Sequence, residues 1–158
     1  MIKKKNIFYF FFILLIFSVD RISKVLIIRL SNTTENQEII VSKFLSLNLI
    51  WNKGIAFGIF SFDEKFFYNI LTMIIIIVTL VVFWLMVKAE NLEKYGFMII
   101  FSGSLGNVYD RLVYSSVPDF IDFHFENFHW FIFNVADIFI TTGVVLLILN
   151  EFNFKKKI

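Results

Sequence analysis

The sequence predicts an all-α membrane protein with four transmembrane helices and a small β-sheet in the first external loop. The 158-residue chain is 58% hydrophobic and 20% aromatic, with a mean hydropathy of +0.77. Its charged fraction is 18%, whereas soluble domains average about 25%. The chain has only one proline and six glycines, so helix-breaking residues are few, and the charges gather at the ends of the apolar segments. Such a chain exposes too much apolar surface for water, so the bilayer is its expected solvent.

Four segments are long enough to cross a bilayer, which takes about 20 predominantly apolar residues in a helix. The predicted spans are residues 7–28, 66–87, 95–114 and 131–150, and the second of them contains no charge. For the first span, a cleavable secretory signal is the alternative, because three lysines precede a short apolar stretch. No small-residue cleavage site follows Ser18, and the apolar run resumes at Val25. An uncleaved helix is therefore favoured.

The segments between these spans predict a small sheet on one side of the membrane. In residues 30–65, apolar and polar residues alternate over 45–49, which is typical of a half-buried strand. Asn52-Lys53-Gly54 is expected to form a turn, followed by the apolar residues 55–57. The second external loop, residues 115–130, is rich in Phe, His and Trp, which suit a membrane–water interface. Since no linker divides the chain, we expect a single domain over residues 1–158.

The distribution of lysines predicts the orientation. Lysine triplets stand near both ends of the chain, and the short link at residues 88–94 carries two more. Basic residues favour the cytoplasmic side. We therefore expect both termini in the cytoplasm and the two longer loops outside.

Ionisable residues inside the spans are the most informative feature, because charge within a bilayer is costly and marks a cavity or a partner. With a rise of about 1.5 Å per residue, Asp20, Asp110 and Asp137 all fall in the outer third of the membrane. Asp20–Lys24 and Asp110–Arg111 contain both signs, so we expect structural ion pairs there. Asp137 has no basic residue within a helical turn. An unpaired carboxylate at this depth is a functional candidate.

Other polar and small residues have simpler explanations. Asn107 and Asn134 could be hydrogen-bonding links between helices, and Asp119, which follows the single proline, could be an ordinary turn residue. Ser102, Gly103 and Gly106 would let a neighbouring helix approach closely.

Metal and thiol chemistry are not expected. The absence of cysteine excludes disulfides and thiolate catalysis. His124 and His129 lie five apart in a loop with no third ligand expected beside them, whereas a zinc site uses three or four ligands. We therefore expect no metal and no cofactor.

Five short motifs resemble those of the lipoprotein signal peptidases, the type II bacterial signal peptidases, over almost the whole chain. In chain order they are Asp20-x-x-Ser23-Lys24, Asn52-x-Gly54-x-Ala56-Phe57, Gly103-x-x-Gly106-Asn107-x-x-Asp110-Arg111, Val117-x-Asp119-Phe120 and Phe133-Asn134-x-Ala136-Asp137. There are departures: Arg21 stands where the family often has Gln, Ser102 precedes Gly103 where paired glycines are common, and Pro118 precedes Asp119. None of them removes a side chain with an implied function.

The resemblance implies an aspartic endopeptidase with Asp119 and Asp137 as its catalytic pair. It would cut diacylglyceryl-modified prolipoproteins on the N-terminal side of the lipidated cysteine, at the outer face of the bacterial cytoplasmic (inner) membrane. The implied substrate-binding residues are Asn52, Gly54, Asn107, Arg111 and Asn134. The implied supporting residues are Asp20, Lys24 and Asp110. Membrane lipid is an expected partner, nucleic acid is not, and the protein is expected to be monomeric.

Two other functions remain open from the residues alone. An ion-coupled carrier would also use intramembrane Asp and Asn, but would need them through the whole membrane thickness. A non-catalytic assembly factor would leave Asp137 unexplained. Only its motif position separates Asp119 from Asp122, which lies in the same loop.

Overall fold

The structure, a computed structural model, describes residues 4–33, 38–54, 65–126 and 128–155. In chain order its elements are α1 (Lys4–Thr33), β1 (Glu38–Ser42), β2 (Leu45–Asn52), α2 (Lys65–Lys88), α3 (Asn91–Tyr114), β3 (Val117–Phe125), β4 (Phe128–Phe133) and α4 (Val135–Lys155). Helices α1, α2 and α3 cover the first three predicted spans, and α4 covers the fourth from Val135 onward. The predicted apolar stretch at residues 55–57 lies outside the described residues.

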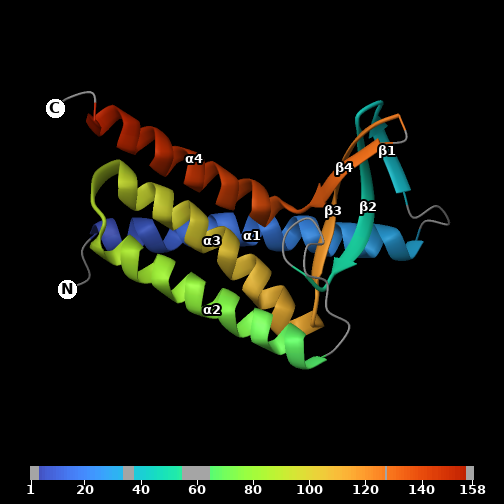
Figure 1. The fold of residues 1–158 in the computed structure, drawn as a ribbon, viewed down its shortest axis with the longest axis horizontal. Coiled ribbons are helices and arrows are strands. Elements are labelled where there is room, and N and C mark those ends of the chain that lie inside the picture. Colours follow the sequence, from blue (N-terminus) through green and yellow to red (C-terminus); the bar gives the residue numbers. More distant parts are fainter. Residues whose placement is uncertain (1–3, 34–37, 55–64, 127, 156–158) are drawn as a thin grey trace.

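The four helices run alternately up and down, and the sheet stands at one end of the bundle (Figure 1). Helix α3 contacts α1, α2 and α4. The start of α1, the end of α4 and the link between α2 and α3 lie at the end of the bundle away from the sheet (Figure 1). The α3 C-terminus and the α4 N-terminus therefore both meet the sheet.

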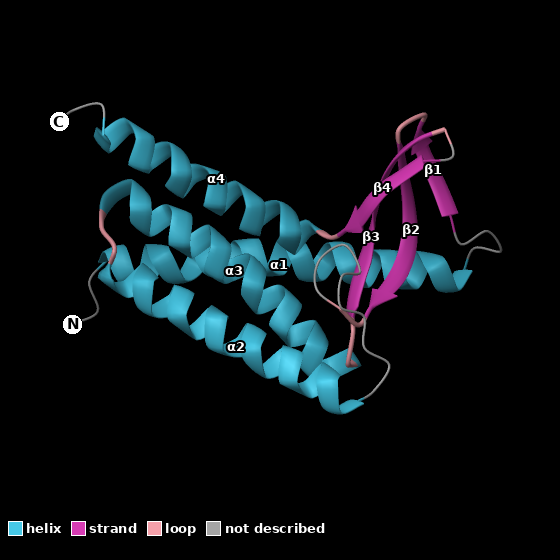
Figure 2. Ribbon diagram, in the orientation of Figure 1, coloured by secondary structure: helices cyan, strands magenta, loops and turns pink. Residues whose placement is uncertain are grey.

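The sheet is larger than predicted. Its four strands are antiparallel in the order β1-β2-β3-β4 (Figure 2). The strand expected at residues 45–49 is confirmed as part of β2. Residues 115–130 were expected to form an aromatic loop, and that prediction was wrong, because most of them belong to β3 and β4. Aromatic residues are as typical of strands as of interfaces, and the pairing of β3 with β2 decides between the two.

The predicted span at residues 131–150 was also wrong at its start. Phe131 and Phe133 belong to β4 and pair with β3, and α4 begins at Val135. Asn134 caps the helix, since its Oδ1 accepts a hydrogen bond from the Asp137 backbone N–H at 3.2 Å. In return, the Asn134 backbone N–H donates to Asp137 Oδ2 at 3.1 Å. This reciprocal capping box fixes the first turn of α4.

Much of the helical surface is apolar and exposed. Among the described residues, two helices, Lys65–Lys88 and Val135–Phe152, are both long and apolar enough to cross a membrane. Helices α1 and α3 have 30 and 24 residues and carry the buried charged residues Asp20, Lys24, Asp110 and Arg111. Large apolar side chains on these two helices also point outward, including Phe10, Leu15, Leu26 and Leu112.

Small residues let α3 and α4 approach closely, as the sequence predicted for Gly103 and Gly106. A Cβ atom on Gly103 would lie 2.7 Å from the Ala136 carbonyl oxygen. A Cβ atom on Gly106 would collide with the Asp20 carboxylate. The glycines thus keep room for contacts at the start of α4.

Replacing Gly103 with alanine should therefore push α4 away from α3. Backbone atoms cannot give way as a flexible side chain would, and overpacking of this kind costs about 1–3 kcal/mol. We expect Gly103→Ala to lower the melting temperature in detergent, while the adjacent Ser104→Ala leaves it nearly unchanged. Equal melting temperatures for the two variants would contradict the packing described here.

Candidate active site

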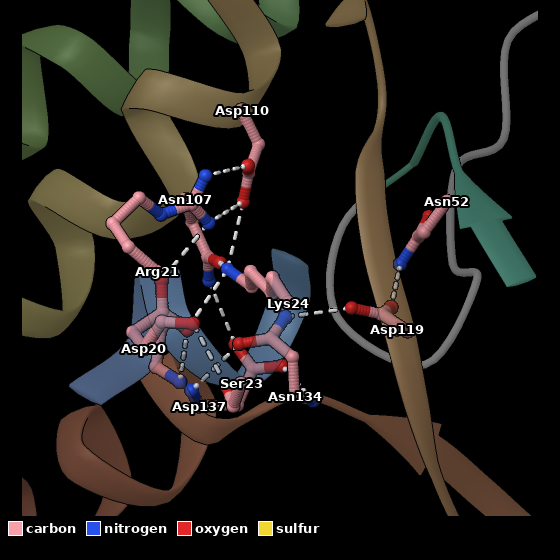
Figure 3. A network of polar contacts seen from close by, with 11 residues as sticks. Asp20, Arg21, Ser23, Lys24, Asn52, Asn107, Asp110, Asp119, Asn134 and Asp137 are labelled. Atoms are coloured by element: carbon pink, nitrogen blue, oxygen red, sulfur yellow. Dashed lines mark hydrogen bonds and ion pairs between the residues drawn. The ribbon is translucent and has the colours of Figure 1, made fainter. Parts of the chain in front are cut away.

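A buried ionic network joins α1 to α3 at the sheet end of the bundle (Figure 3). The Lys24 ammonium contacts Asp20 Oδ1 at 3.0 Å and Asp110 Oδ2 at 2.7 Å. It also donates to Asn107 Oδ1 at 2.8 Å. Lys24, Asp20 and Asp110 are all fully buried. A buried lysine needs such partners, because an unpaired charge removed from water is strongly destabilising.

Arg21 completes this network. Its sequence position indicated only a departure from the family pattern, not a role in the site. It donates to both oxygens of Asp110, from Nη1 at 2.5 Å and from Nη2 at 2.8 Å. Its guanidinium also lies 4.9 Å from the centre of the Tyr109 ring. The predicted Asp20–Lys24 pair is confirmed, but the predicted Asp110–Arg111 pair was wrong. Successive residues diverge by about 100° around a helix, so Asp110 and Arg111 point to different neighbours.

Arg111 faces β2 and α2 instead of Asp110. Its Nη2 donates to the Gly54 carbonyl, and its guanidinium lies 5.8 Å from the Tyr68 ring centre. Nε and Nη1 of Arg111 are buried without a hydrogen-bond partner among the described residues. These spare donors can bind an acceptor.

Asp20 connects the network to α4. Its Oδ1 accepts a hydrogen bond from the Ala136 backbone N–H at 3.0 Å, one of the free N–H groups in the first turn of α4. One residue on, Asp137 accepts from Asn107 Nδ2 at 2.9 Å. No lysine or arginine in the described part of the chain forms a salt bridge with Asp137. Its carboxylate is therefore positioned by amide groups.

Asp119 lies on β3 beside Asp137. It is 3% exposed, and its two oxygens accept from Asn134 Nδ2 at 2.6 Å and from Asn52 Nδ2 at 2.8 Å. Asn134 thus contacts both aspartates, through its side-chain amide to Asp119 and through its backbone to Asp137. Figure 3 shows Asp119 on β3 with Asn52 opposite it, and Asp137 at the start of α4.

Burial is the main cause that raises the pKa of Asp119 to about 6, and the nearby Asp137 carboxylate adds to it. Hydrogen bonds from Asn134 and Asn52, together with the Lys24 charge, act in the opposite direction on this pKa. Two neighbouring carboxylates in a low-dielectric site resist ionising together. The pair is therefore suited to hold one proton between them.

Asp122 is not part of this site. It is buried, but its Oδ2 lies 2.7 Å from His129 Nδ1 on β4. Successive side chains of a strand alternate between its faces, so Asp122 and Asp119, three residues apart, point to opposite faces of the sheet. The structure thereby distinguishes Asp119, which lies in the site, from Asp122, which does not; the sequence alone could not do so.

Most of the residues singled out from the sequence lie in one place. A continuous network of hydrogen bonds and ion pairs joins eight of them: Asp20, Lys24, Asn52, Asn107, Asp110, Asp119, Asn134 and Asp137. Gly54 and Arg111 contact each other, and the Gly54 N–H donates to Asn52 Oδ1 at 2.7 Å. Arg21 was missed as a site residue, although its position beside Asp20 on a largely apolar helix was a usable signal.

Solved structures with the same fold are bacterial membrane enzymes. One, determined by the in meso method at 2.3 Å, is 25% identical with a TM-score of 0.78, covering 94% of this chain and 90% of that one. A second, determined by the same method at 1.9 Å, is 26% identical with a TM-score of 0.70 and 90% of both chains covered. The fold is therefore that of a bacterial membrane enzyme.

Sequence comparisons give the family. The signal peptidase (SPase) II family model matches residues 12–153. The lipoprotein signal peptidase of Pelagibacter ubique (strain HTCC1062) is 50% identical over 145 residues, 92% of this chain and 87% of the relative. That of Francisella tularensis subsp. novicida (strain U112) is 37% identical, with 94% of both chains covered. The chain belongs to the signal peptidase II family, as its five motifs predicted.

The raised pKa of Asp119 predicts a stability that depends on pH. Below the ordinary pKa of 3.8, the carboxyl group is protonated in both the folded and the unfolded chain. As the pH rises, the unfolded chain releases this proton first, so the folded state loses stability until the pH passes about 6. Asp119→Asn lacks this contribution. The melting temperature of the wild type minus that of Asp119→Asn should therefore fall between about pH 4 and pH 6. A flat difference over this range would contradict the assignment.

Proposed function

We propose that Asp119 and Asp137 are the catalytic dyad of an aspartic endopeptidase that cuts diacylglyceryl-modified prolipoproteins N-terminal to the lipidated cysteine. As a member of the signal peptidase II family, the protein is a peptidase that removes signal peptides from prolipoproteins. The observation that carries the residue assignment is the shared contact with Asn134, which holds both carboxylates in one buried site.

The proposed reaction uses one water molecule and one proton shared by the dyad. The ionised aspartate takes a proton from water, whose oxygen attacks the scissile carbonyl. The protonated aspartate donates a hydrogen bond to the carbonyl oxygen and stabilises its developing negative charge. A proton then passes to the leaving amine as the C–N bond breaks. One water is consumed, giving a carboxyl terminus on the signal peptide and a free amine on the lipidated cysteine.

Neighbouring residues divide into those that position the dyad and those that face the substrate. Asn52, Asn107 and Asn134 donate amide hydrogens to the two carboxylates, which supports an orienting role as well as the substrate contacts expected from the motifs. Arg111, with its spare donors beside Gly54, is suited to hold a substrate carbonyl. The remaining ionic residues, Asp20, Lys24 and Asp110, support the framework.

We further propose that all four helices cross the bacterial inner membrane as a single domain, with the site at the outer face. Apolar side chains on the outer surface of α1 and α3 support this, as do the two strongly apolar helices α2 and α4. The start of α1 and the end of α4 lie away from the sheet (Figure 1), so cytoplasmic termini would place the sheet and the dyad outside. A lipid anchor keeps a substrate cysteine near that interface. We propose a monomer, because one chain supplies every residue of this site.

An ion-coupled carrier is the competing function. It needs polar groups along a path through the membrane. The buried charged residues of the described helices are Asp20 and Lys24 on α1 and Asp110 and Arg111 on α3. Figure 3 shows the first three grouped beside β3, and Arg111 contacts Gly54, which follows β2. This distribution favours a site with one opening.

Removing either dyad carboxyl should stop catalysis without unfolding the protein. Asp119→Asn and Asp137→Asn each keep the size of the side chain but cannot act as both acid and base. We expect each to lower the rate of cleavage of a diacylglyceryl-modified prolipoprotein by at least about 1,000-fold, measured with purified protein in detergent. Glu93→Gln, an exposed carboxyl at the other end of α3, is the matched control and should cleave at the wild-type rate. Near-normal turnover by either asparagine variant would refute the dyad.

Reporter fusions test the four-span topology. A reporter fused after Ile158 should be active in the cytoplasm, whereas one inserted after Asn32 should be active outside. The reason is that an even number of spans returns the chain to the side on which it began. Reporters on the same side would show that one of the helices does not span the membrane.

A further inference from the structure

The β3–β4 hairpin brings together three side chains that the sequence separates. His124 and His129 are directly opposite in the β-ladder, and Asp122 precedes His124 by two residues on the same strand. A ligand atom from each of the three lies within 4.8 Å of the other two. Asp122 Oδ2 and His129 Nδ1 are 2.7 Å apart. A metal was not expected from the sequence because a third ligand was lacking. Folding of the hairpin places Asp122 where it can be that third ligand.

Two polar atoms of this cluster are buried without a partner. Asp122 is 0% exposed, and neither its Oδ1 nor His124 Nδ1 has a hydrogen-bond partner in the described part of the chain. Ser46, opposite Asp122 on β2, also has a buried hydroxyl without a partner there. Buried polar atoms of native proteins are nearly always satisfied, and each exception calls for an explanation. A bound cation would satisfy the carboxylate and the imidazole together.

The chemistry of the three ligands indicates which cation. Two imidazoles and one carboxylate suit zinc and related divalent transition metals, whereas calcium and magnesium prefer oxygen ligands alone. His129 is half exposed, with 53% of its side chain accessible. An ion can therefore enter from the solvent side, and water can complete its coordination.

We propose that Asp122, His124 and His129 form a binding site for a divalent transition-metal ion of the Zn²⁺ type. The site is separate from the dyad, because Asp119 faces Asn52 and Asn134 on the other side of the sheet. Its effect is structural: the ion joins β3 to β4. These strands carry Asp119 and lead into Asn134, so the ion stiffens the segment that positions half of the dyad.

The test measures metal binding directly and does not depend on peptidase activity. The full-length protein, purified in detergent with an affinity tag that contains no histidine, is stripped with EDTA and titrated with Zn²⁺. We expect about one equivalent of Zn²⁺ per chain and a higher melting temperature in its presence. Asp122→Asn and His129→Ala should each bind Zn²⁺ at least about tenfold more weakly. Glu126→Gln, which removes an exposed carboxyl from the same hairpin, should bind like the wild type.

A second measurement keeps the test independent of how the variants fold. Co²⁺ added to the stripped wild type should give the visible absorption of a site with nitrogen and oxygen ligands, and Zn²⁺ should abolish it. If the wild type binds no more Zn²⁺ than His129→Ala and gives no such absorption, the cluster is a histidine–aspartate hydrogen bond alone and the proposal is wrong. Because cleavage is not measured, this outcome leaves the dyad assignment untouched.

Discussion

The burial of the Lys24 ammonium between Asp20 and Asp110 is the constraint on which the rest of the site depends. Charges removed from water must be paired within the protein, and the bilayer offers no substitute. Lys24 meets this requirement with acceptors from α1 and α3. Arg21 adds two bonds to Asp110. These contacts fix α1 and α3 relative to each other. Rotation of either helix about its axis, or translation along it, would separate the charged partners.

The same network fixes the start of α4. Asp20 accepts the Ala136 N–H, and Gly103 and Gly106 give α4 the room to reach it. Asn134 and Asp137 then close the first turn of the helix by capping each other. The capping box at the start of α4 thus places Asp137, one carboxylate of the proposed dyad, next to the residue that Asp20 holds. Amide groups hold this carboxylate in position.

The other carboxylate depends on the sheet. Asp119 lies on β3, and its position follows from pairing with β2, which brings Asn52 to it, and from the turn into α4, which brings Asn134. The alternation of side chains along β3 sends Asp122 to the opposite face, toward His129. One strand thus carries a residue of the proposed dyad and a residue of the proposed metal site, and strand pairing holds both in place.

The sequence by itself determined the features that depend on local composition and spacing. Apolar segments marked four helices, lysines indicated their expected orientation, and the i,i+4 spacing gave the Asp20–Lys24 pair. Five motifs gave the family. Two inferences failed because they depended on partners from elsewhere in the chain. Residues 115–130 became strands through pairing with β2 and with each other, and Asp110 took Arg21 in place of Arg111. Folding of the hairpin also placed Asp122 beside His124 and His129. Only the tertiary structure could decide these, since aromatic runs, adjacent charges and separated ligands each allow several partners, and packing selects among them.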